Sequence, residues 1–401
     1  MSEAEHGQSR AYRAVPDSML EVGAEVPQTI YDPYERILLR SGQPLKSERH
    51  RRLLREIGRV RDDAAAEPAA GADAAAAPAT VDPLERMERC LRGIRRVHTA
   101  LLEEARYDFL PGLQRTLALL GDLVDRDGDA ALGAAKLVRG ASRHLHPLHC
   151  AVITDLVARA AGWPGRQRHA AVGAALTANL GMLELQDELE QQLTPLTETQ
   201  RYHLHQHPLR GTERLQRAGL EDPVWLRAVE QHHERLDGSG YPHGASGDAI
   251  SEEACLVMLS DVYTALISPR AHREAREVHR ALRELYEMAG SVYPEAYTHL
   301  LINTIGIFPP GTPVRLSSGE RALSVRRSPS HSARPAVYVY AGPEGLVEAP
   351  YTRDLAAEGL EVETVLRRLP QELPFELQQA WGYPARTARS EPSGASQGRA
   401  T

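Results

Sequence analysis

This chain of 401 residues has few lysines and few aromatic residues, and it has no excess of positive charge. Of the 47 basic residues only Lys46 and Lys136 are lysines, so no lysine is available for chemistry beyond position 136. Aromatic residues make up 5% of the chain, too few to predict a stacking platform for nucleic-acid bases. The 54 acidic residues give a formal net charge of -7, which argues against a broad basic surface. We therefore expect no nucleic-acid partner.

Cysteine and long apolar runs are also sparse. The three cysteines, Cys90, Cys150 and Cys255, lie far apart, and no pair has the spacing of a zinc knuckle. No stretch of 18 consecutive apolar residues occurs, which predicts that no segment spans a membrane. The first ten residues, MSEAEHGQSR, lack the pattern of a secretory signal peptide. Together these absences predict a cytoplasmic protein of a reducing compartment, and the 42% hydrophobic content is enough for a normal core.

The chain divides into segments of different composition and apolar period, and its fold class is expected to be mainly α. Residues 61–82 contain 11 alanines, and two prolines and a glycine interrupt them, which predicts a flexible linker. Helices of 10–20 residues follow the linker, and the apolar period changes to two after Pro310. We expect a disordered tail over 1–18, a small β-containing module over 19–60, the linker over 61–82, a helical domain over 83–310, a short antiparallel β extension over 311–365 and a disordered tail over 385–401.

The helical domain begins with a clear start signal. Asp82 can cap a helix whose first position suits Pro83, just as Ser47 can cap an earlier helix over 48–57. Apolar residues then recur every three or four positions, at Leu84, Met87, Leu91, Ile94, Val97 and Leu101. This face packs either inside the domain or against a second copy in a homodimer, and the sequence leaves both open.

A paired histidine before a glycine-rich turn is the first candidate for chemistry. His232 and His233 precede residues 237–242, with the sequence DGSGYP. Adjacent histidines on a helix project about 100° apart, so they can bind two neighbouring metal ions, or one metal and one substrate oxygen. The glycines allow a turn that sets Tyr241 over a pocket. Taken alone, this pattern is more often structural than catalytic.

A buried carboxylate and further histidines are the other candidates. Asp261 is the only charged residue between Glu253 and Arg270, inside an apolar helical stripe. A carboxylate there must pair, bind a metal or become protonated, because desolvation costs several kcal/mol or more. Metal ligation and a buried ion pair with an arginine stay equally open. Two histidine clusters add further candidates: His203, His205 and His207, of which His207 is favoured, and His144, His146 and His149, of which one on the inward face could be a ligand.

In this order the motifs resemble the signature of the HD-GYP family, bacterial phosphodiesterases that hydrolyse cyclic di-GMP. Residues 232–242 match it closely, and residues 261–266 resemble the family's metal-ligand helix, with Thr264 where a second aspartate is usual. The resemblance covers about residues 140–345 and implies an HD-GYP-type helical bundle. It implies the metal ligands His146 (or His149 if the register shifts), His207, His232, His233 and Asp261, and the substrate contacts Gly240, Tyr241, Pro242, Arg270 and Arg273.

The family's name-giving His-Asp doublet and the lysine after it are missing. Aligned to that stretch, residues 174–182 place Ala178 at the histidine, Asn179 at the aspartate and Met182 at the lysine. No shift of register restores them, because residues 170–183 contain no histidine and no charged residue. Ser142 stands where members with an extra metal carry a glutamate. In the family the lost aspartate bridges two metals that activate a water, so we expect here one divalent metal at most (iron, manganese or zinc) or none.

These substitutions favour a catalytically impaired HD-GYP protein of bacterial cyclic di-GMP signalling, which binds the nucleotide or a partner. An active metal-dependent phosphodiesterase that yields pGpG or GMP stays open, as does a helical scaffold that binds neither metal nor nucleotide. Whether the chain is an enzyme is therefore undecided at this point. The resemblance also implies diguanylate cyclase (GGDEF) domains as protein partners.

Restoring the missing residues tests this interpretation. A variant that combines Ala178→His, Asn179→Asp and Met182→Lys should bind more metal than the unaltered chain, because it regains two ligands. The measurement is elemental analysis of both proteins after the same purification. No gain in metal would mean that the site has lost more than the doublet.

Overall fold

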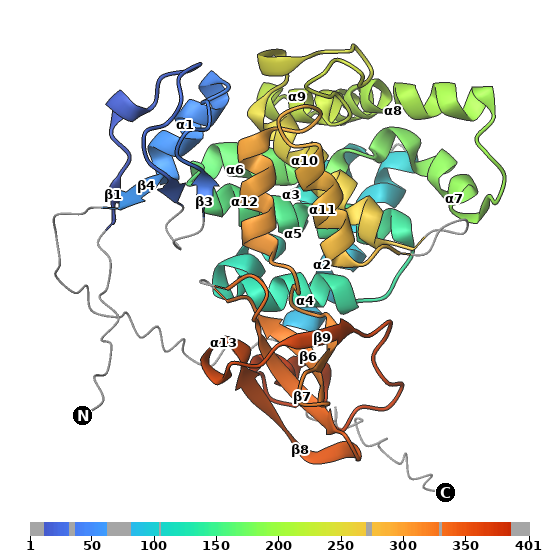
Figure 1. The fold of residues 1–401 in the computed structure, drawn as a ribbon. Coiled ribbons are helices and arrows are strands. Elements are labelled where there is room, and N and C mark those ends of the chain that lie inside the picture. Colours follow the sequence, from blue (N-terminus) through green and yellow to red (C-terminus); the bar gives the residue numbers. More distant parts are fainter. Residues whose placement is uncertain are drawn as a thin grey trace, which may run out of the picture.

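The computed structural model describes residues 12–31, 37–61, 82–103, 106–269, 275–328 and 331–385. A helical domain lies between a small N-terminal sheet and a C-terminal sheet (Figure 1), so the mainly α fold class is confirmed. Among the helices of the described residues, none has the length and apolarity to cross a bilayer. The helices of the central domain are α2 (Pro83–Leu102), α3 (Arg106–Arg126), α4 (Gly128–Leu137), α5 (Ser142–Ala160), α6 (Gly165–Thr177), α7 (Leu183–Gln191), α8 (Glu198–Arg217), α9 (Pro223–Gln231), α10 (Glu252–Ile267), α11 (Val278–Glu287) and α12 (Glu295–Ile305).

The N-terminal module is a four-stranded antiparallel sheet with one helix. Its strands follow the order β1-β4-β2-β3, and helix α1 (Glu48–Ile57) begins at Ser47, whose hydroxyl accepts a hydrogen bond from the His50 amide at 3.1 Å. This confirms Ser47 as a cap. The strands are β1 (Tyr12–Ala14), β2 (Ile30–Tyr31), β3 (Ile37–Leu39) and β4 (Arg59–Arg61).

The expected N-terminal tail over 1–18 is wrong for its last residues. Strand β1 pairs with β4, with Tyr12 opposite Arg61, and a 3-10 helix over Asp17–Met19 follows it. Because the pairing partner of β1 lies far along the chain, three residues of local pattern could not predict it. Residues 1–11, 62–81 and 386–401, on which the other tail and linker expectations fall, lie outside the described residues.

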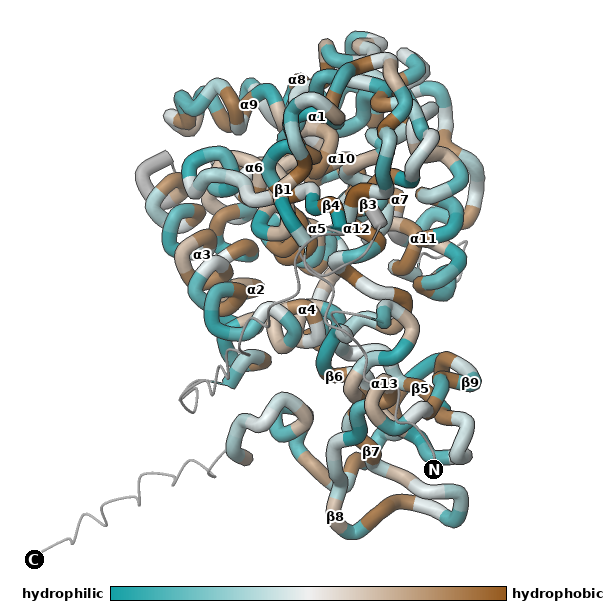
Figure 2. The backbone as a smooth tube through the Cα atoms, turned by 60° about the vertical axis from the view of Figure 1, so that its left-hand side comes forward, coloured by the Kyte–Doolittle hydropathy of each residue, from teal (hydrophilic) through white to brown (hydrophobic). Residues whose placement is uncertain are grey.

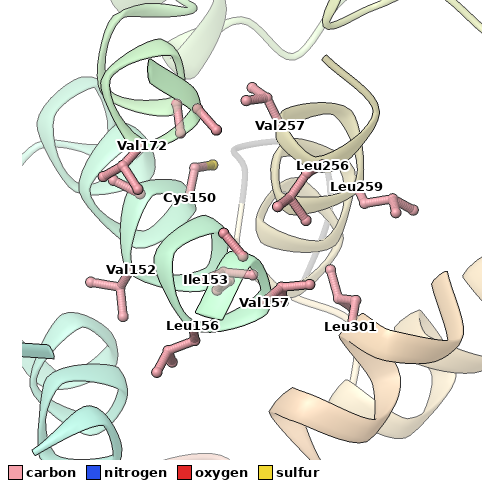
Figure 3. Packing of buried hydrophobic residues seen from close by; sticks show 14 of the residues in the cluster. Cys150, Val152, Ile153, Leu156, Val157, Val172, Leu256, Val257, Leu259 and Leu301 are labelled. Carbon is pink, nitrogen blue, oxygen red and sulfur yellow. The ribbon is translucent and has the colours of Figure 1, made fainter. Parts of the chain in front are cut away.

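Helix α5 is the centre of the hydrophobic core. It packs against α4, α6, α10 and α12, and Figure 3 shows its side chains meeting those of α10 and α12. The same buried cluster continues without a break into the N-terminal module through residues such as Ile30 and Leu54. The buried Arg49 of α1 also donates a hydrogen bond to the Ile250 carbonyl, just ahead of α10. The module and the helical domain therefore share one core.

The apolar face of α2 packs inside the chain. Asp82 accepts a hydrogen bond from the Leu84 amide at 2.8 Å, which confirms it as the cap. Met87 and Ile94 are fully buried, and α2 packs chiefly along α3. Apolar and polar segments alternate along both helices in Figure 2. Of the two interpretations left open by the sequence, the structure therefore shows packing inside the domain.

The C-terminal extension is a five-stranded antiparallel sheet in the order β8-β7-β6-β5-β9. Beyond it, a 3-10 helix over Leu377–Trp381 packs against both α2 and the sheet, and the Trp381 indole donates a hydrogen bond to the Val325 carbonyl of β6 at 3.0 Å. Arg326 pairs with Asp127 at the start of α4, which fixes the sheet to the bundle. The elements are β5 (Pro313–Leu316), β6 (Arg321–Arg326), β7 (Ala336–Gly342), β8 (Gly345–Asp354), helix α13 (Leu355–Glu358) and β9 (Val362–Val365).

Two helix glycines give opposite predictions for stability. A Cβ at Gly173 of α6 would lie 2.2 Å from the Trp225 ring, which is itself held by a hydrogen bond to Thr177 at 2.8 Å. Gly173→Ala should therefore lower the free energy of unfolding by about 1–3 kcal/mol, as overpacking does. Gly121→Ala in α3 meets no atom within 4 Å and should instead raise it by up to about 1 kcal/mol. Urea unfolding of both variants checks this, and a neutral Gly173→Ala would contradict it.

Candidate functional site

Three histidines from α8 and the end of α9 lie together. The Nδ1 atoms of His207 and His232 contact the carbonyl oxygens of Leu204 and Val229, at 2.6 Å and 2.5 Å. A carbonyl can only accept, so each Nδ1 carries the proton and each Nε2 keeps a lone pair. The two Nε2 atoms face each other at 3.2 Å. Facing lone pairs repel, and a cation between them would remove the conflict.

The spacing of these nitrogens fits a metal ion. Zinc lies about 2.0–2.1 Å from imidazole nitrogen, which places two tetrahedral nitrogen ligands about 3.4 Å apart. Burial, together with the neighbouring His232, lowers the pKa of His207 to about 3. Burial also lowers the pKa of His233, whose ring centre is 4.9 Å from that of His207. Burial lowers the pKa of His232 as well, so all three stay neutral, which is the protonation state that binds metal.

A second group joins α5 to α10. His146 Nε2 lies 2.8 Å from Asp261 Oδ1 and 3.4 Å from Cys150 Sγ. Within each of the two groups, all ligand atoms lie within 4.8 Å of one another. Burial alone would raise the pKa of Asp261, but the hydrogen bond and charge of His146 hold it well below its usual range. The carboxylate is therefore ionised, and its partner is a histidine instead of an arginine.

A cavity of about 730 Å³ opens beside these groups. Its wall includes His146 and Asp261 from one group and His233 from the other. Among the described lining residues there is no lysine and no arginine. The remaining lining residues are Ser142, Asn179, Met182, Gln186, Leu189, Gln192, Leu193, Thr194, Pro195, Leu196, Leu204, Tyr241, Ala265, Ser268 and Pro269.

Two of the three residues aligned to the missing doublet and lysine, Asn179 and Met182, line this cavity. Ala178, which follows α6, is 2% exposed and offers no ligand atom. Asn179 is 6% exposed, and its buried Oδ1 has no hydrogen-bond partner among the described residues. An amide oxygen in this state could accept from a bound molecule or ligate a metal, but it carries no charge. Met182 adds an uncharged thioether to the wall.

The glycine-rich turn places Tyr241 against the histidines. The Tyr241 amide donates to the His233 carbonyl at 3.1 Å, and the His243 amide donates to the buried Glu234 carboxylate at 2.7 Å. The Tyr241 ring stacks on His205 and His233, with ring centres 4.5 and 4.7 Å away. A Cβ at Gly240 would lie 2.5 Å from backbone atoms, so only glycine fits there. The turn therefore holds Tyr241 at the cavity, as the sequence predicts, and the Tyr241–Pro242 peptide is cis.

Comparison with known proteins identifies the segment that carries these groups. Residues 135–296 match the family model described as an HD domain. A cyclic di-GMP phosphodiesterase of Pseudomonas aeruginosa is 26% identical over 211 residues, 52% of this chain and 49% of that protein. A cyclic di-GMP phosphodiesterase response regulator of Xanthomonas campestris pv. campestris is 30% identical over 187 residues, 45% of this chain and 48% of that protein. This segment is an HD domain of the HD-GYP type.

The HD domain has other relatives with related names. A 3'3'-cGAMP-specific phosphodiesterase of Vibrio cholerae is 30% identical over 156 residues, 39% of this chain and 34% of that protein. A solved HDG"Y"P protein from Bdellovibrio bacteriovorus superimposes with a TM-score of 0.46 at 16% identity, covering 73% of this chain and 98% of that chain. The chain spans about half the length of the first two curated relatives.

Several histidines predicted as candidates lie elsewhere in the HD domain. His144 Nδ1 is 3.0 Å from His98 Nδ1 in a separate buried pair. His149 is buried, and burial followed by the charge of Lys136 lowers its pKa to about 3. His146 is therefore the member of its cluster that meets Asp261. Arg270 and Arg273 lie outside the described residues, so their contact with substrate stays a prediction.

Cys150 is the residue that sequence reasoning missed. No second cysteine lies near it in the sequence, as a zinc knuckle would require. A different signal was present, since His146 and Cys150 are four positions apart and share one helix face. His205, which the sequence did not favour as a ligand, is exposed, and its ring stacks on Tyr241.

Removing one histidine should weaken metal binding by the HD domain. His232→Ala deletes one of the two facing Nε2 atoms, and we expect at least about a 10-fold loss of metal affinity, since even outer-shell changes cost about 10–100-fold. The exposed His169 of α6 gives the matched control, His169→Ala. Equilibrium dialysis against zinc, manganese and iron salts measures both. Equal metal binding by the two variants would rule out the histidine group as a ligand set.

Proposed function

We propose that the chain acts in bacterial cyclic di-GMP signalling, as a metal-holding HD-GYP domain that binds the nucleotide and hydrolyses it poorly. One observation carries this proposal. The cavity wall keeps His146, His233, Asp261 and Tyr241, while Asn179 and Met182 occupy the wall where the family has an aspartate and a lysine. Diguanylate cyclase (GGDEF) domains are the protein partners that fit this role.

The cavity has the size and chemistry for a cyclic dinucleotide. Its volume of about 730 Å³ lies within the range of ordinary ligand sites. Tyr241, with Gly240 and Pro242 around it, adds an aromatic ring to the wall that a base could contact. The described wall has no lysine or arginine for the phosphates. Their charge must therefore be met by metal or by Arg270 and Arg273, which follow the lining residue Pro269 in the chain.

The same wall explains why hydrolysis should be slow. A divalent metal held by the two ligand groups, one around His207 and one around His146, would lower the pKa of a bound water and stabilise charge on a phosphate oxygen. Asn179 is neutral, so it cannot replace a carboxylate as a bridge between two metals. Ala178 offers no ligand, and the Met182 thioether cannot supply the positive charge of a lysine. All three changes remove stabilisation of the reaction while leaving the cavity open.

An active phosphodiesterase is the second candidate, and the survival of both ligand groups favours it. The buried Asn179 oxygen could then serve as a neutral ligand in place of the aspartate. Such an enzyme would yield pGpG or GMP.

Incubation with cyclic di-GMP separates the two candidates. Calorimetry should show binding, and chromatography of the mixture should show little or no linear product. The relatives make 3'3'-cGAMP the second nucleotide to compare. Metal-dependent turnover of either nucleotide would overturn the proposal that hydrolysis is impaired. The absence of binding to both would overturn the proposal that the domain binds a cyclic dinucleotide.

Tyr241→Ala should weaken nucleotide binding by about 10-fold or more, because a base stacked on an aromatic side chain is worth about 1–3 kcal/mol. The control is Tyr286→Ala, which removes a 59% exposed tyrosine of α11 that does not line the cavity. Thermal unfolding of both variants accompanies the binding measurement. Unfolding of the Tyr241→Ala protein would show that the tyrosine is structural instead.

A further inference from the structure

We propose that Cys150 is a metal ligand, and that with His146 and Asp261 it makes a site that selects zinc over iron or manganese. The inference rests on the metal-holding part of the proposed function. It concerns which metal the HD domain holds and which residue decides this. Neither the family match nor the names of the relatives assign a role to Cys150.

The three ligand atoms have the spacing of a metal site. His146 and Cys150 project from one face of α5, and Asp261 faces them from α10. For zinc, ligand distances of about 2.3 Å to sulfur and 2.0–2.2 Å to nitrogen or oxygen put tetrahedral ligands about 3.4–3.6 Å apart. The sulfur–nitrogen distance is 3.4 Å. The hydrogen-bonded His146–Asp261 pair, at 2.8 Å, would need to open by about half an ångström to reach that spacing.

Cys150 differs from the two other cysteines of the chain. Buried free cysteines usually act as small hydrophobic residues, and Cys90 and Cys255 fit that role, since burial raises the pKa of each to about 12. Figure 3 shows Cys150 extending from α5 toward α10, among the core side chains. Its thiol donates to the Ser260 carbonyl at 3.6 Å, and its sulfur faces His146 Nε2. It is therefore part of a polar cluster within the core.

A thiolate would change the preference of the site. Sulfur ligands favour zinc, whereas carboxylate and water favour manganese and magnesium. Cys150 would add a second anionic ligand beside Asp261, close to the wall where Asn179 carries no charge. Metal binding displaces two protons to solvent, one from the Cys150 thiol and one from His146 Nε2, which donates to Asp261 in the metal-free protein, so one sulfur–metal and one nitrogen–metal bond replace one S–H and one N–H bond. Because Cys150 does not line the cavity, it would hold the metal from the core side and leave the nucleotide face open.

Cobalt substitution tests the sulfur ligand directly. Protein stripped of metal and loaded with Co²⁺ should show a near-ultraviolet sulfur-to-cobalt charge-transfer band. Cys150→Ser should lose this band, whereas Cys255→Ser, which alters a fully buried thiol of α10, should keep it. Cys150→Ser should also lower zinc affinity by at least about 10-fold and change manganese affinity less. A band that persists in Cys150→Ser would overturn the inference.

X-ray absorption of the unaltered zinc-loaded protein keeps the test independent of how the variant folds. It should show a zinc–sulfur distance of about 2.3 Å. Bound zinc without sulfur would overturn the role of Cys150 and leave the nucleotide role standing. A zinc–sulfur bond in a chain that binds no cyclic dinucleotide would overturn the proposed function alone.

Discussion

The packing of α5 against α10 is the constraint on which the rest of the site depends. The two helices bury an almost continuous apolar surface, and within it they carry His146, Cys150 and Asp261. An ionised carboxylate in such a place is tolerated only with a partner, and His146 supplies one at 2.8 Å. The interface thus fixes a charged pair at the floor of the cavity, where burial would otherwise favour the neutral forms of both groups.

The group formed by His207, His232 and His233 is uncharged, in contrast to the His146–Asp261 pair. Backbone carbonyls hold the Nδ1 protons of His207 and His232, so two lone pairs face each other in a fully buried place. The two histidines carry no net charge, but their facing lone pairs repel each other in the absence of a cation and would bind one that lies between them. The neighbouring turn adds Tyr241, whose position depends on the absence of a side chain at Gly240. One side of the HD domain therefore combines neutral nitrogen ligands, an ionised carboxylate and an aromatic ring.

Positions 178, 179 and 182 carry none of the three residues expected from the HD-GYP resemblance, whereas His146, His207, His232, His233 and Asp261 are present. Asn179 and Met182 put uncharged side chains at the cavity wall where a carboxylate and a lysine are expected, and Ala178 is smaller than the expected histidine. Binding needs shape and a few matched polar groups, whereas hydrolysis needs charge placed where the phosphate changes. This loss of charge at the wall is the physical reason why the proposed function separates binding from turnover. Cys150 would also change the charge of the site, because a thiolate ligand would add one negative charge on the side of the core.

The sequence by itself determined the helices and the motif. The caps at Ser47 and Asp82, the glycine-rich turn, the strands of period two and the missing doublet are all local patterns, in which spacing along the chain fixes which residues share a face. The tertiary structure decided the rest: that His146 instead of His149 meets Asp261, that Cys150 joins them, that β1 pairs with β4, and that the N-terminal module shares the core of the helices. These contacts join elements that lie far apart in the chain. The packing of the elements sets the distances between them, and local periodicity carries no information about those distances.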